Sequence, residues 1–371
     1  MNITSVEHEC NKLLHDSPFE YVYKIKPAIK VYPHKISSAA EMVVAKKWIY
    51  ARAFTGLPTR ENFRLEEETL PDIKDNEFLA EAIFASVDPY IRVYMARYPI
   101  GSVMVGGQVA KVLQSRHPSF PVGSYIHGNF GWRTHTVCQP DHSEPDWEPY
   151  VLPDFGNEPL SLGLGVLGMP GITAYFGFLE ICKPVAGETV VVSGAAGAVG
   201  SLVGQIAKIK GCEVVGIAGS DEKCEWLKGL GCDHVINYKT SDIEVELRKA
   251  APRGVDCYFD NVGGHITEIV REQMNVFGRI SVCGSISSYN GEKAKVADPQ
   301  PDFLWKQLSQ VGFINWRWNN RRLEAIQQNL KWIQEGRLIY RETVTEGFDN
   351  LPAAFIGMLS GANTGKAVVK I

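Results

Sequence analysis

Glycines and small residues fill the segment from Gly194 to Gly200, which reads Gly-Ala-Ala-Gly-Ala-Val-Gly and directly follows the apolar run 189–193. Small side chains at Ala195 and Gly197 let the backbone approach phosphate oxygens, and Gly200 lets a following helix pack closely on a sheet. The N-terminus of that helix offers free N–H groups and positive potential to an anion. A buried strand, the turn, an amphipathic helix and a second strand follow in the order of a dinucleotide fingerprint. We therefore interpret the turn as a pyrophosphate site rather than a plain tight turn.

The residues after the second strand bear on which dinucleotide is bound. A site that prefers NAD usually carries an acid there to hold the ribose hydroxyls. This chain instead has Ile217-Ala218-Gly219-Ser220, followed by Asp221 and Lys223. Small and hydroxyl side chains leave room for a 2′-phosphate, and Lys223 can neutralise it, so the pattern favours NADPH. The alternative is that Lys223 is a solvated lysine and that Asp221 binds a ribose or caps the helix.

No set of zinc ligands is visible in the sequence. The histidines are dispersed, with His127 and His135 the nearest pair in the middle of the N-terminal domain, and no cysteine lies close enough to complete a set. His127 is therefore expected to be structural or part of a pocket wall, and no metal is predicted. Without a Lewis acid to polarise a carbonyl, hydride addition to the β-carbon of an enone is favoured over alcohol oxidation. That reaction needs a donor to the developing enolate, which a tyrosine hydroxyl, or a ribose hydroxyl oriented by one, can supply.

The elements that must position these residues follow two patterns. Residues 42–164 hold short strands joined by turns, which predicts an antiparallel or barrel-like domain. Residues 165–335 alternate strands and helices, which predicts an α/β fold with a Rossmann doubly wound parallel sheet. Residues 336–371 return to short strands and are expected to pack back on the first domain. Residues 1–41 are interpreted as an N-terminal extension outside the main fold, and their acidic start argues against a mitochondrial transit peptide.

Composition excludes several classes of protein. A chain of 371 residues with 45% hydrophobic content can form two packed cores, and a net charge of -4 leaves no basic face for nucleic acid. The eight cysteines are scattered without a regular framework, which is typical of thiols in a reducing compartment. No apolar run approaches the roughly 20 residues of a membrane-spanning helix. We expect a cytoplasmic protein that acts on a small molecule.

Five motifs together point to one family: Asp-Pro-Tyr-Ile-Arg at 88–92, the run 168–177, Gly-Ser-Asp-Glu-Lys at 219–223, Asn-Tyr-Lys at 237–239 and Phe-Asp-Asn-Val-Gly-Gly at 259–264. From about residue 42 onward the chain resembles the prostaglandin reductases, or leukotriene B4 dehydrogenases, which are zinc-independent medium-chain dehydrogenases/reductases. The resemblance implies a GroES-like, mostly antiparallel β-barrel catalytic domain beside the Rossmann domain, and a cytoplasmic homodimer. It also implies NADPH-dependent reduction of 15-oxo-prostaglandins and other α,β-unsaturated ketones and aldehydes, with oxidation of leukotriene B4 as a further activity.

The resemblance also implies which residues form the site. Tyr289 is expected in the catalytic role, where it would orient the ribose hydroxyl or the substrate oxygen. The pyrophosphate turn would be Ala196, Gly197, Ala198 and Val199, and the 2′-phosphate would lie between Lys223 and Tyr238. Asn261 would lie near the ribose. The nicotinamide would be contacted by Met169, Thr173, Cys283, Gly284, Ser285, Ile286, Ser287, Tyr289, Phe313, Ile314, Asn315 and Asn363.

Simpler interpretations remain open for several of these residues. Tyr238 and Tyr289 could be packing tyrosines with a satisfied hydroxyl, and Asn261 and Asn363 could be turn residues beside glycine. Asp88 and Arg92 could form a structural ion pair, and Tyr90 could line the pocket or fill the barrel. Three tryptophans could shape a lipid-sized pocket or form a core or dimer contact: Trp305, Trp316 and Trp318.

Two departures from the family and two alternative functions also remain. The extension 1–41 leaves the localisation open, and the segment 290–309 has fewer prolines than expected, which puts the prostaglandin preference in doubt. A zinc-free quinone reductase and a non-catalytic NADPH-binding protein are the alternatives. Ile280–Cys283 is a candidate edge strand for pairing in a dimer.

Overall fold

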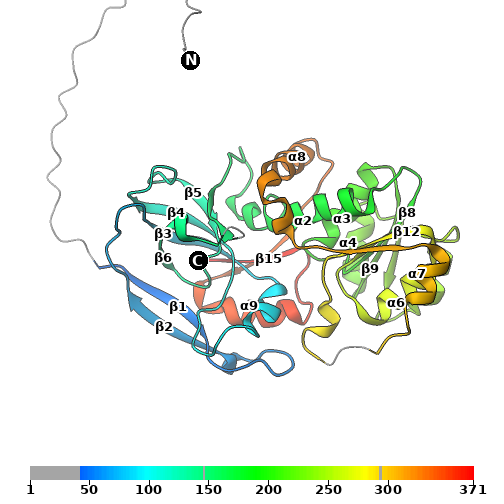
Figure 1. Ribbon diagram of the computed structural model, residues 1–371, viewed down its shortest axis with the longest axis horizontal. Coiled ribbons are helices and arrows are strands. Elements are labelled where there is room, and N and C mark those ends of the chain that lie inside the picture. Colours follow the sequence, from blue (N-terminus) through cyan, green and yellow to red (C-terminus); the bar gives the residue numbers. More distant parts are fainter. Residues whose placement is uncertain (1–41, 145–146, 292–294) are drawn as a thin grey trace, which may run out of the picture. The chain divides into compact units, whose positions relative to one another are not determined.

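The computed structural model describes residues 42–144, 147–291 and 295–371 (Figure 1). Residues 189–312 contain a parallel sheet of six strands. All of its strand pairs are parallel, in the order β10-β9-β8-β11-β12-β13. The strands are β8 (Thr189–Ser193), β9 (Glu213–Ala218), β10 (His234–Asn237), β11 (Val255–Asp260), β12 (Met274–Val282) and β13 (Ser309–Gly312). This topology confirms the doubly wound sheet. The prediction for residues 1–41 lies outside the described residues.

Helices alternate with these strands along the chain, as the sequence predicts for a doubly wound sheet. They are α3 (Gly200–Ile209), α4 (Asp221–Gly229), α5 (Ile243–Ala250), α6 (Gly264–Glu272) and α7 (Gln300–Lys306), followed by the 3-10 helix η7 (Asn315–Arg321) and α8 (Arg322–Gln334). Val190, Val191 and Val192 of the central strand β8 are fully buried. A strand covered on both faces needs such a continuous apolar run, which explains why β8 coincides with the predicted run 189–193.

A second sheet, largely antiparallel, is built from the N-terminal half and the C-terminal segment. Its order is β14-β15-β3-β4-β5-β7, with β6 paired to β3. The strands are β3 (Phe78–Ser86), β4 (Gln108–Ser115), β5 (Tyr125–Gly128), β6 (His135–Cys138), β7 (Tyr150–Val151), β14 (Glu342–Glu346) and β15 (Lys366–Lys370). β15 pairs with β3, Val368 opposite Ser86, so the predicted return of the chain is present. β1 (Val44–Tyr50) and β2 (Phe63–Thr69) form a separate antiparallel ribbon.

The remaining helices connect or cover the two sheets. They are α1 (Tyr90–Met95), α2 (Met169–Phe176) and α9 (Leu351–Leu359), with the short segments η1 (Arg60–Asn62), η2 (Pro140–His142), η4 (Leu160–Leu164), η5 (Gly177–Cys182), η6 (Ile286–Ser288) and η8 (Phe348–Asn350). Pro170 lies in the first turn of α2, where proline is tolerated because its N–H would be unpaired anyway. A Cβ on Gly171 would lie 1.9 Å from the Val166 carbonyl oxygen, so only glycine fits there.

One hydrophobic cluster joins the two halves within residues 42–371. It contains Val109 and Leu152 of the N-terminal half, Val192 and Phe259 of the parallel sheet, and Val368 of β15. The two sheets therefore pack as one compact unit, which fixes the loops at the carboxyl ends of β8, β9 and β11 against the N-terminal half.

The edges of the parallel sheet correct one prediction. Ile280–Cys283 was expected at an edge, but β12 lies between β11 and β13 and is an inner strand. The edges are β10 and β13, and the four residues of β13 are exposed. A short, polar strand such as Ser-Gln-Val-Gly does not look like part of a sheet in the sequence, because it lacks an apolar run.

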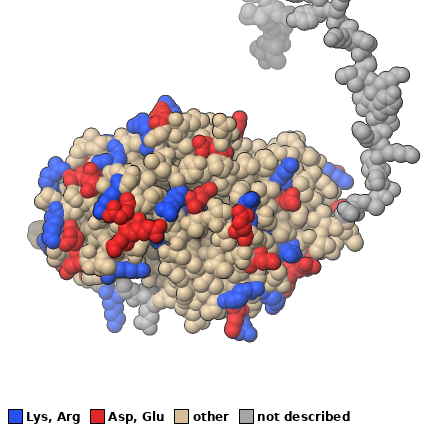
Figure 2. Space-filling model, turned by 180° about the vertical axis from the view of Figure 1, so that it is seen from behind, with Lys and Arg blue, Asp and Glu red and all other residues tan. Residues whose placement is uncertain are grey.

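Charges are mixed over the surface. On the face in Figure 2, basic and acidic side chains of the described residues alternate over a mainly uncharged surface. No described helix combines the length and the apolar composition that crossing a membrane requires.

Candidate functional site

The pyrophosphate turn links β8 to α3 and has the geometry expected of a phosphate cradle. Gly194 has a φ of +59°, and Gly197 donates its N–H to the Gly194 carbonyl at 3.0 Å. A Cβ on Gly200 would lie 2.4 Å from the same carbonyl oxygen, so glycine is required for α3 to start this close to the turn. Among the described residues, the N–H groups of Ala198 and Val199 have no hydrogen-bond acceptor. They are available to an anion at the start of α3.

The residues predicted to hold the 2′-phosphate lie together at the carboxyl end of β9. The Tyr238 ring packs on Gly219, where an added Cβ would lie 2.8 Å from the Tyr238 hydroxyl. Ser220 caps α4 by accepting the Lys223 N–H at 3.3 Å. Burial, and next the charge of Lys239, lower the pKa of Lys223. The second effect shows two neighbouring cations whose mutual repulsion a 2′-phosphate would relieve.

Asp221 was considered as a possible cap of α4. Its Oδ1 accepts a hydrogen bond from Asn237 Nδ2 at 2.7 Å, which joins the start of α4 to the end of β10. Ser220, not Asp221, caps the helix, so that alternative is wrong. The Lys223 side chain is half-buried and its ammonium donates to the Gly361 carbonyl at 2.7 Å, so it is not simply a solvated lysine.

Asn261 lies at the carboxyl end of β11 beside the pyrophosphate turn. Its side-chain amide donates to the Ser193 carbonyl at 2.7 Å, and its N–H donates to Ser193 Oγ at 3.0 Å. Gly194 is close by, because an added Cβ there would lie 3.4 Å from Asn261 Cβ. The structure therefore brings Asn261 and the turn together.

Asp260 organises this corner, and the sequence reasoning did not identify it. The side chain is 2% exposed, and its carboxylate accepts hydrogen bonds from five donors. The donors are Ser193 Oγ at 3.1 Å, the Tyr258 hydroxyl at 2.9 Å, the N–H groups of Val262 and Gly263 at 2.9 Å each, and Thr267 Oγ1 at 2.6 Å. A buried carboxylate needs such donors. The sequence did contain a signal for this residue, because Asp260 is an acid at the end of an apolar strand, directly before Asn-Val-Gly-Gly.

The loop 283–289 continues from β12 alongside this corner. Cys283 donates its N–H to the Asp260 carbonyl at 2.8 Å, and Ser287 donates its hydroxyl to the Val262 carbonyl at 2.7 Å. Burial, and next the Asp260 charge, raise the pKa of Cys283 to about 12, so its thiol stays protonated. The Tyr289 hydroxyl accepts the Ser285 N–H at 3.3 Å and keeps its own proton for another acceptor. Gly284 and Ile286 lie in the same loop.

Asn363 reaches the turn from the C-terminal segment. Its side-chain amide donates to the Gly365 carbonyl at 2.8 Å, and Gly365 donates its N–H to the Ala196 carbonyl at 2.9 Å. Gly365 also bridges Gly197. Thus the predicted phosphate, ribose and loop residues form one continuous set with Asn363.

The other predicted nicotinamide residues form a second group around α2. The Thr173 hydroxyl donates to Met169 Sδ at 3.6 Å, and Thr173 is 5% exposed. The Phe313 ring packs on Gly177, where a Cβ would lie 2.3 Å from the ring. Asn315 is half-buried, whereas Ile314 is 52% exposed. The ring of Phe313 lies 6.3 Å from that of Phe259, which connects this group to β11.

The Asp-Pro-Tyr-Ile-Arg motif is held by a different ion pair from the one considered. Asp88 pairs with Lys366 at 3.0 Å, and both side chains are buried. Arg92 instead donates to the Gly56 carbonyl at 3.2 Å and lies over the Phe54 ring at 4.9 Å. The Asp88–Arg92 pair is therefore wrong, because the chain brings β15 back against Asp88.

Aromatic residues of the two halves meet near α1. The Trp316 ring lies 5.1 Å from Trp147 and 6.3 Å from Tyr94, and the Tyr94 ring lies 5.3 Å from Tyr90. Burial, and next the charge of Asp88, raise the pKa of Tyr90. These four rings are called the aromatic wall below.

The other two tryptophans differ from Trp316. Trp318 is 3% exposed and stacks on Phe176 at 5.3 Å, so it belongs to the core. Trp305 is 78% exposed.

A groove of about 430 Å³ is lined by Trp147 together with Asn129, Phe130, Arg133, Thr136, Val137, Cys138, Gln139, Ser143, Glu144 and Pro149.

His127 lies in β5, close to Tyr150 and Arg322. It stacks on Tyr150 at 5.1 Å, and the Arg322 guanidinium lies 4.6 Å from the same Tyr150 ring. Burial, and next the charge of Arg322, lower the pKa of His127 to about 4, which keeps the imidazole neutral. Within the described ranges, no group of three or more His, Cys, Asp or Glu residues is arranged to hold a metal ion.

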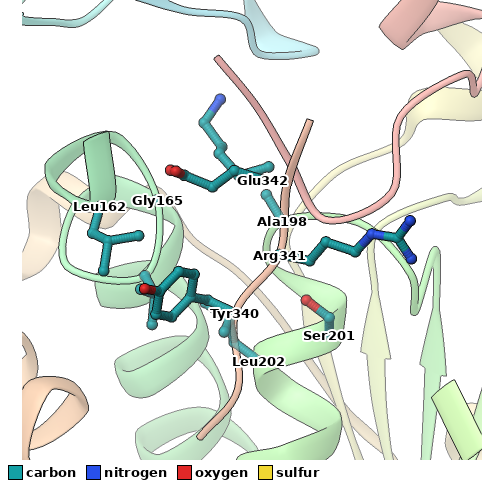
Figure 3. Close-up of a pocket in the computed structure, with 10 residues that line it drawn as sticks. Leu162, Gly165, Ala198, Ser201, Leu202, Tyr340, Arg341 and Glu342 are labelled. Carbon is teal, nitrogen blue, oxygen red and sulfur yellow. The ribbon is translucent and has the colours of Figure 1, made fainter. Parts of the chain in front are cut away.

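A small cavity lies behind the pyrophosphate turn (Figure 3). Its volume is about 10 Å³, and its walls include Ala198, Ser201, Tyr340, Glu342 and Lys366. That volume holds about one water molecule. Burial raises the pKa of Glu342, and its Oε1 is buried without a hydrogen-bond partner. The cavity is too small for a substrate.

Comparisons with known proteins agree with this geometry. Residues 46–145 match the family model described as "N-terminal domain of oxidoreductase", and residues 198–335 match the one described as "Zinc-binding dehydrogenase". Prostaglandin reductase 1 of Bos taurus is 49% identical over 89% of this chain and 100% of its own length. The NADPH-dependent curcumin reductase of Escherichia coli is 39% identical over 88% of this chain and 96% of its own length.

A solved structure extends the similarity to the fold. The structure of CurA from Vibrio vulnificus in complex with NADPH matches with a TM-score of 0.81 and 38% identity, over 88% of this chain and 98% of CurA. This chain thus combines the glycine turn, the neighbouring cations Lys223 and Lys239, and the sheet shared by its N- and C-terminal segments, and it has known relatives. The protein belongs to the medium-chain dehydrogenase/reductase superfamily, in the family of the prostaglandin reductases.

Proposed function

We propose that this protein reduces the carbon–carbon double bond of α,β-unsaturated ketones and aldehydes with NADPH. One observation carries the proposal. The phosphate turn, the cationic site at Lys223 and the loop of Tyr289 all lie at the carboxyl ends of the parallel strands β8, β9, β11 and β12. Ligands bind at that end of a doubly wound sheet. The relatives include a prostaglandin reductase, a curcumin reductase and a 2-alkenal reductase.

The residues present fit NADPH. The free N–H groups of Ala198 and Val199 would hold the pyrophosphate, and Lys223 with Tyr238 would hold the 2′-phosphate. Lys239 adds positive potential at the same place. When bound, NADPH supplies the hydride that adds to the β-carbon of the enone. The α-carbon takes a proton from solvent, so that one hydride and one proton are added to the double bond.

Tyr289 supplies the polar contact in this proposal. Its hydroxyl proton is free to be donated while its oxygen accepts the Ser285 N–H. This hydroxyl can donate directly to the substrate oxygen, or it can orient the ribose hydroxyl that does so. Either hydrogen bond stabilises the negative charge that develops on the substrate oxygen. The aromatic wall of Tyr90, Tyr94, Trp147 and Trp316 provides an apolar surface for the rest of the substrate.

The division of labour between the domains follows from the sheets. We assign residues 42–164 and 336–371 to the catalytic domain, supported by the pairing of β15 with β3, and residues 165–335 to the cofactor domain. The protein is placed in the cytoplasm, supported by the seven described cysteines, which are free thiols. A homodimer is assigned through β13, supported by its exposed edge and by the exposed Leu304 and Trp305 of the adjacent α7.

The first experiment follows NADPH consumption with three substrates in parallel: 15-oxo-prostaglandin E2, 4-hydroxynonenal and a simple quinone. NADH replaces NADPH in a second series, and a chelator is added in a third. The proposal expects turnover of the enone or the enal that prefers NADPH and resists the chelator. Faster turnover of the quinone would favour a quinone reductase, and NADPH binding without turnover of any substrate would make the protein a non-catalytic binder.

A further inference from the structure

A short segment of the C-terminal region touches both phosphate sites. This segment, called the strap, is Gly361–Gly365, between α9 and β15. At one end, the Gly361 carbonyl accepts the Lys223 ammonium at 2.7 Å. At the other end, Gly365 donates its N–H to the Ala196 carbonyl at 2.9 Å and bridges Gly197. The strap therefore spans the distance between the site for the 2′-phosphate and the pyrophosphate turn.

The strap is also fixed to the second, largely antiparallel sheet. Thr364 exchanges two hydrogen bonds with Thr343 of β14, at 3.0 and 3.2 Å. The next residue after the strap, Lys366, is 4% exposed and donates to the Val87 carbonyl at 2.8 Å and to Asp88 at 3.0 Å. Asp88 precedes α1, which carries Tyr90 of the aromatic wall. Because breaking a buried ion pair is costly, Lys366 ties the end of the strap to the segment just before α1.

Lys223 has hydrogen-bonding capacity that the protein itself leaves open. An ammonium group has three donors, and one of them goes to Gly361. No carboxylate of the described residues lies within ion-pair distance of Lys223, and the nearby Glu222 pairs with Arg341 at 3.6 Å instead. The remaining donors and the full charge are available to a phosphate without loss of the strap contact.

We propose that Lys223 is shared between the 2′-phosphate and the strap, so that the 2′-phosphate fixes the strap and, through Lys366 and Asp88, positions the catalytic half. The proposal rests on the proposed preference for NADPH and adds a consequence to it. Cofactor choice then affects turnover as well as binding, because a cofactor without the 2′-phosphate leaves the strap held only by its intrinsic contacts.

Hydrogen exchange of the strap amides tests the coupling without hydride transfer. The exchange of the Thr364 and Gly365 amides in the full chain is measured with saturating 2′,5′-ADP and with saturating 5′-AMP, which lacks the 2′-phosphate. The proposal expects 2′,5′-ADP, by holding the Lys223 ammonium against the Gly361 carbonyl, to slow this exchange about tenfold, while 5′-AMP has no comparable effect. Equal protection by the two nucleotides would overturn the proposal.

Two matched variants separate the strap contact from general electrostatics. Lys223→Met removes the strap contact, so 2′,5′-ADP at saturation should no longer protect the strap. Lys239→Met removes a neighbouring cation, and among the described residues the Lys239 ammonium has no hydrogen bond to the strap. This variant should weaken 2′,5′-ADP binding yet keep the protection at saturation. Protection that survives in Lys223→Met, or is lost at saturation in Lys239→Met, would contradict a specific role for Lys223.

Steady-state kinetics give a second readout. In the parent protein the turnover number at saturating NADH should be about tenfold below that at saturating NADPH, and Lys223→Met should bring the two turnover numbers together. Turnover numbers that already agree in the parent protein would overturn the proposal. Failure of the proposed function looks different: no enone or enal is reduced, whereas the effect of 2′,5′-ADP on strap exchange is still present.

Discussion

Replacing Gly200 by alanine tests whether the close approach of α3 to the pyrophosphate turn is needed for cofactor binding. The added methyl group would lie 2.4 Å from the Gly194 carbonyl oxygen and 2.8 Å from Ala195 Cα. Both neighbours are backbone atoms, and ordinary contacts begin near 3.4 Å. The methyl group therefore fits only if the start of α3 moves away from the turn by about 1 Å.

The expected cost follows from that displacement. Forcing an extra methyl group into a packed site costs about 1–3 kcal/mol of folding free energy. The N–H groups of Ala198 and Val199 move with α3, and each hydrogen bond to a charged group contributes about 1.5–3 kcal/mol. The dissociation constant for NADPH should therefore rise by about tenfold or more, since 1.4 kcal/mol corresponds to a factor of ten.

Gly204→Ala is the matched control on the same helix. A Cβ on Gly204 would meet Cys232 Sγ at 3.6 Å and Val214 Cγ1 at 3.7 Å, which are ordinary contacts. Alanine in a helix interior stabilises by about 0.5–1 kcal/mol relative to glycine, so this variant should be at least as stable as the parent. Urea unfolding and NADPH titration by fluorescence measure both effects. The reasoning is refuted if Gly200→Ala matches Gly204→Ala in stability and in NADPH affinity.

Three further substitutions test other features. Phe277→Gly should raise the free energy of unfolding by about 0.5–1 kcal/mol. Phe277 has a φ of +66° and is 64% exposed, so glycine relieves backbone strain with little loss of packing. Urea unfolding measures this free energy, and a value below that of the parent would contradict the prediction. Lys366→Met should lower the free energy of unfolding by about 3–5 kcal/mol, because the buried Asp88 carboxylate loses its ion-pair partner. Lys370→Met, at an exposed ion pair, should change it by less than about 1 kcal/mol. Equal effects of the two substitutions would contradict the stabilising role of the buried pair. Glu342 has a raised pKa, so the folded chain binds its proton more tightly than the unfolded chain does, and its contribution to stability is lost as the pH rises through the folded pKa. Glu342→Gln should therefore gain stability relative to the parent on going from acidic to neutral pH, which thermal unfolding at several pH values measures; a difference that does not change with pH would contradict this.

The parts of the fold that depend on local sequence were predictable. The apolar run 189–193 became β8, and the glycine pattern that follows it became the turn and the start of α3. Both depend on residues within a few positions of each other, through burial on two faces and through backbone contacts that only glycine permits. For the same reason the cation at Lys223 could be assigned to the end of β9.

The contacts that connect distant segments were not predictable from one sequence. Lys366 and Asp88 are 278 positions apart, and Lys223 and Gly361 are 138 positions apart. Periodicity and composition describe which face of an element is buried, but not which element covers it. Asp88 and Arg92 are four positions apart and looked like a local pair, yet the return of β15 places a lysine against Asp88.

Local motifs position some of the predicted site residues, whereas others depend on contacts outside their own segment. Tyr238 packs on Gly219, where a local motif places it, whereas Tyr289 contacts the N–H of Ser285 in its own loop. The partner of the remaining Tyr289 proton depends on a bound ligand. In the proposed function the substrate would contact the aromatic wall, to which α1, residue 147 and η7 contribute, and no periodic pattern in the sequence links these segments.

The pairing of β15 with β3 has a consequence for synthesis on the ribosome. β3 is completed at Ser86, but its partner at Val368 is made about 280 residues later, and β14 is made only shortly before. The six strands of the parallel sheet, residues 189–312, emerge as one uninterrupted stretch and can pair as they appear. During that interval the edge of β3 that β15 will occupy has no partner strand, so it can bind chaperones or another nascent chain. Translation that stalls before residue 366 would therefore leave a complete parallel sheet beside an incomplete antiparallel one.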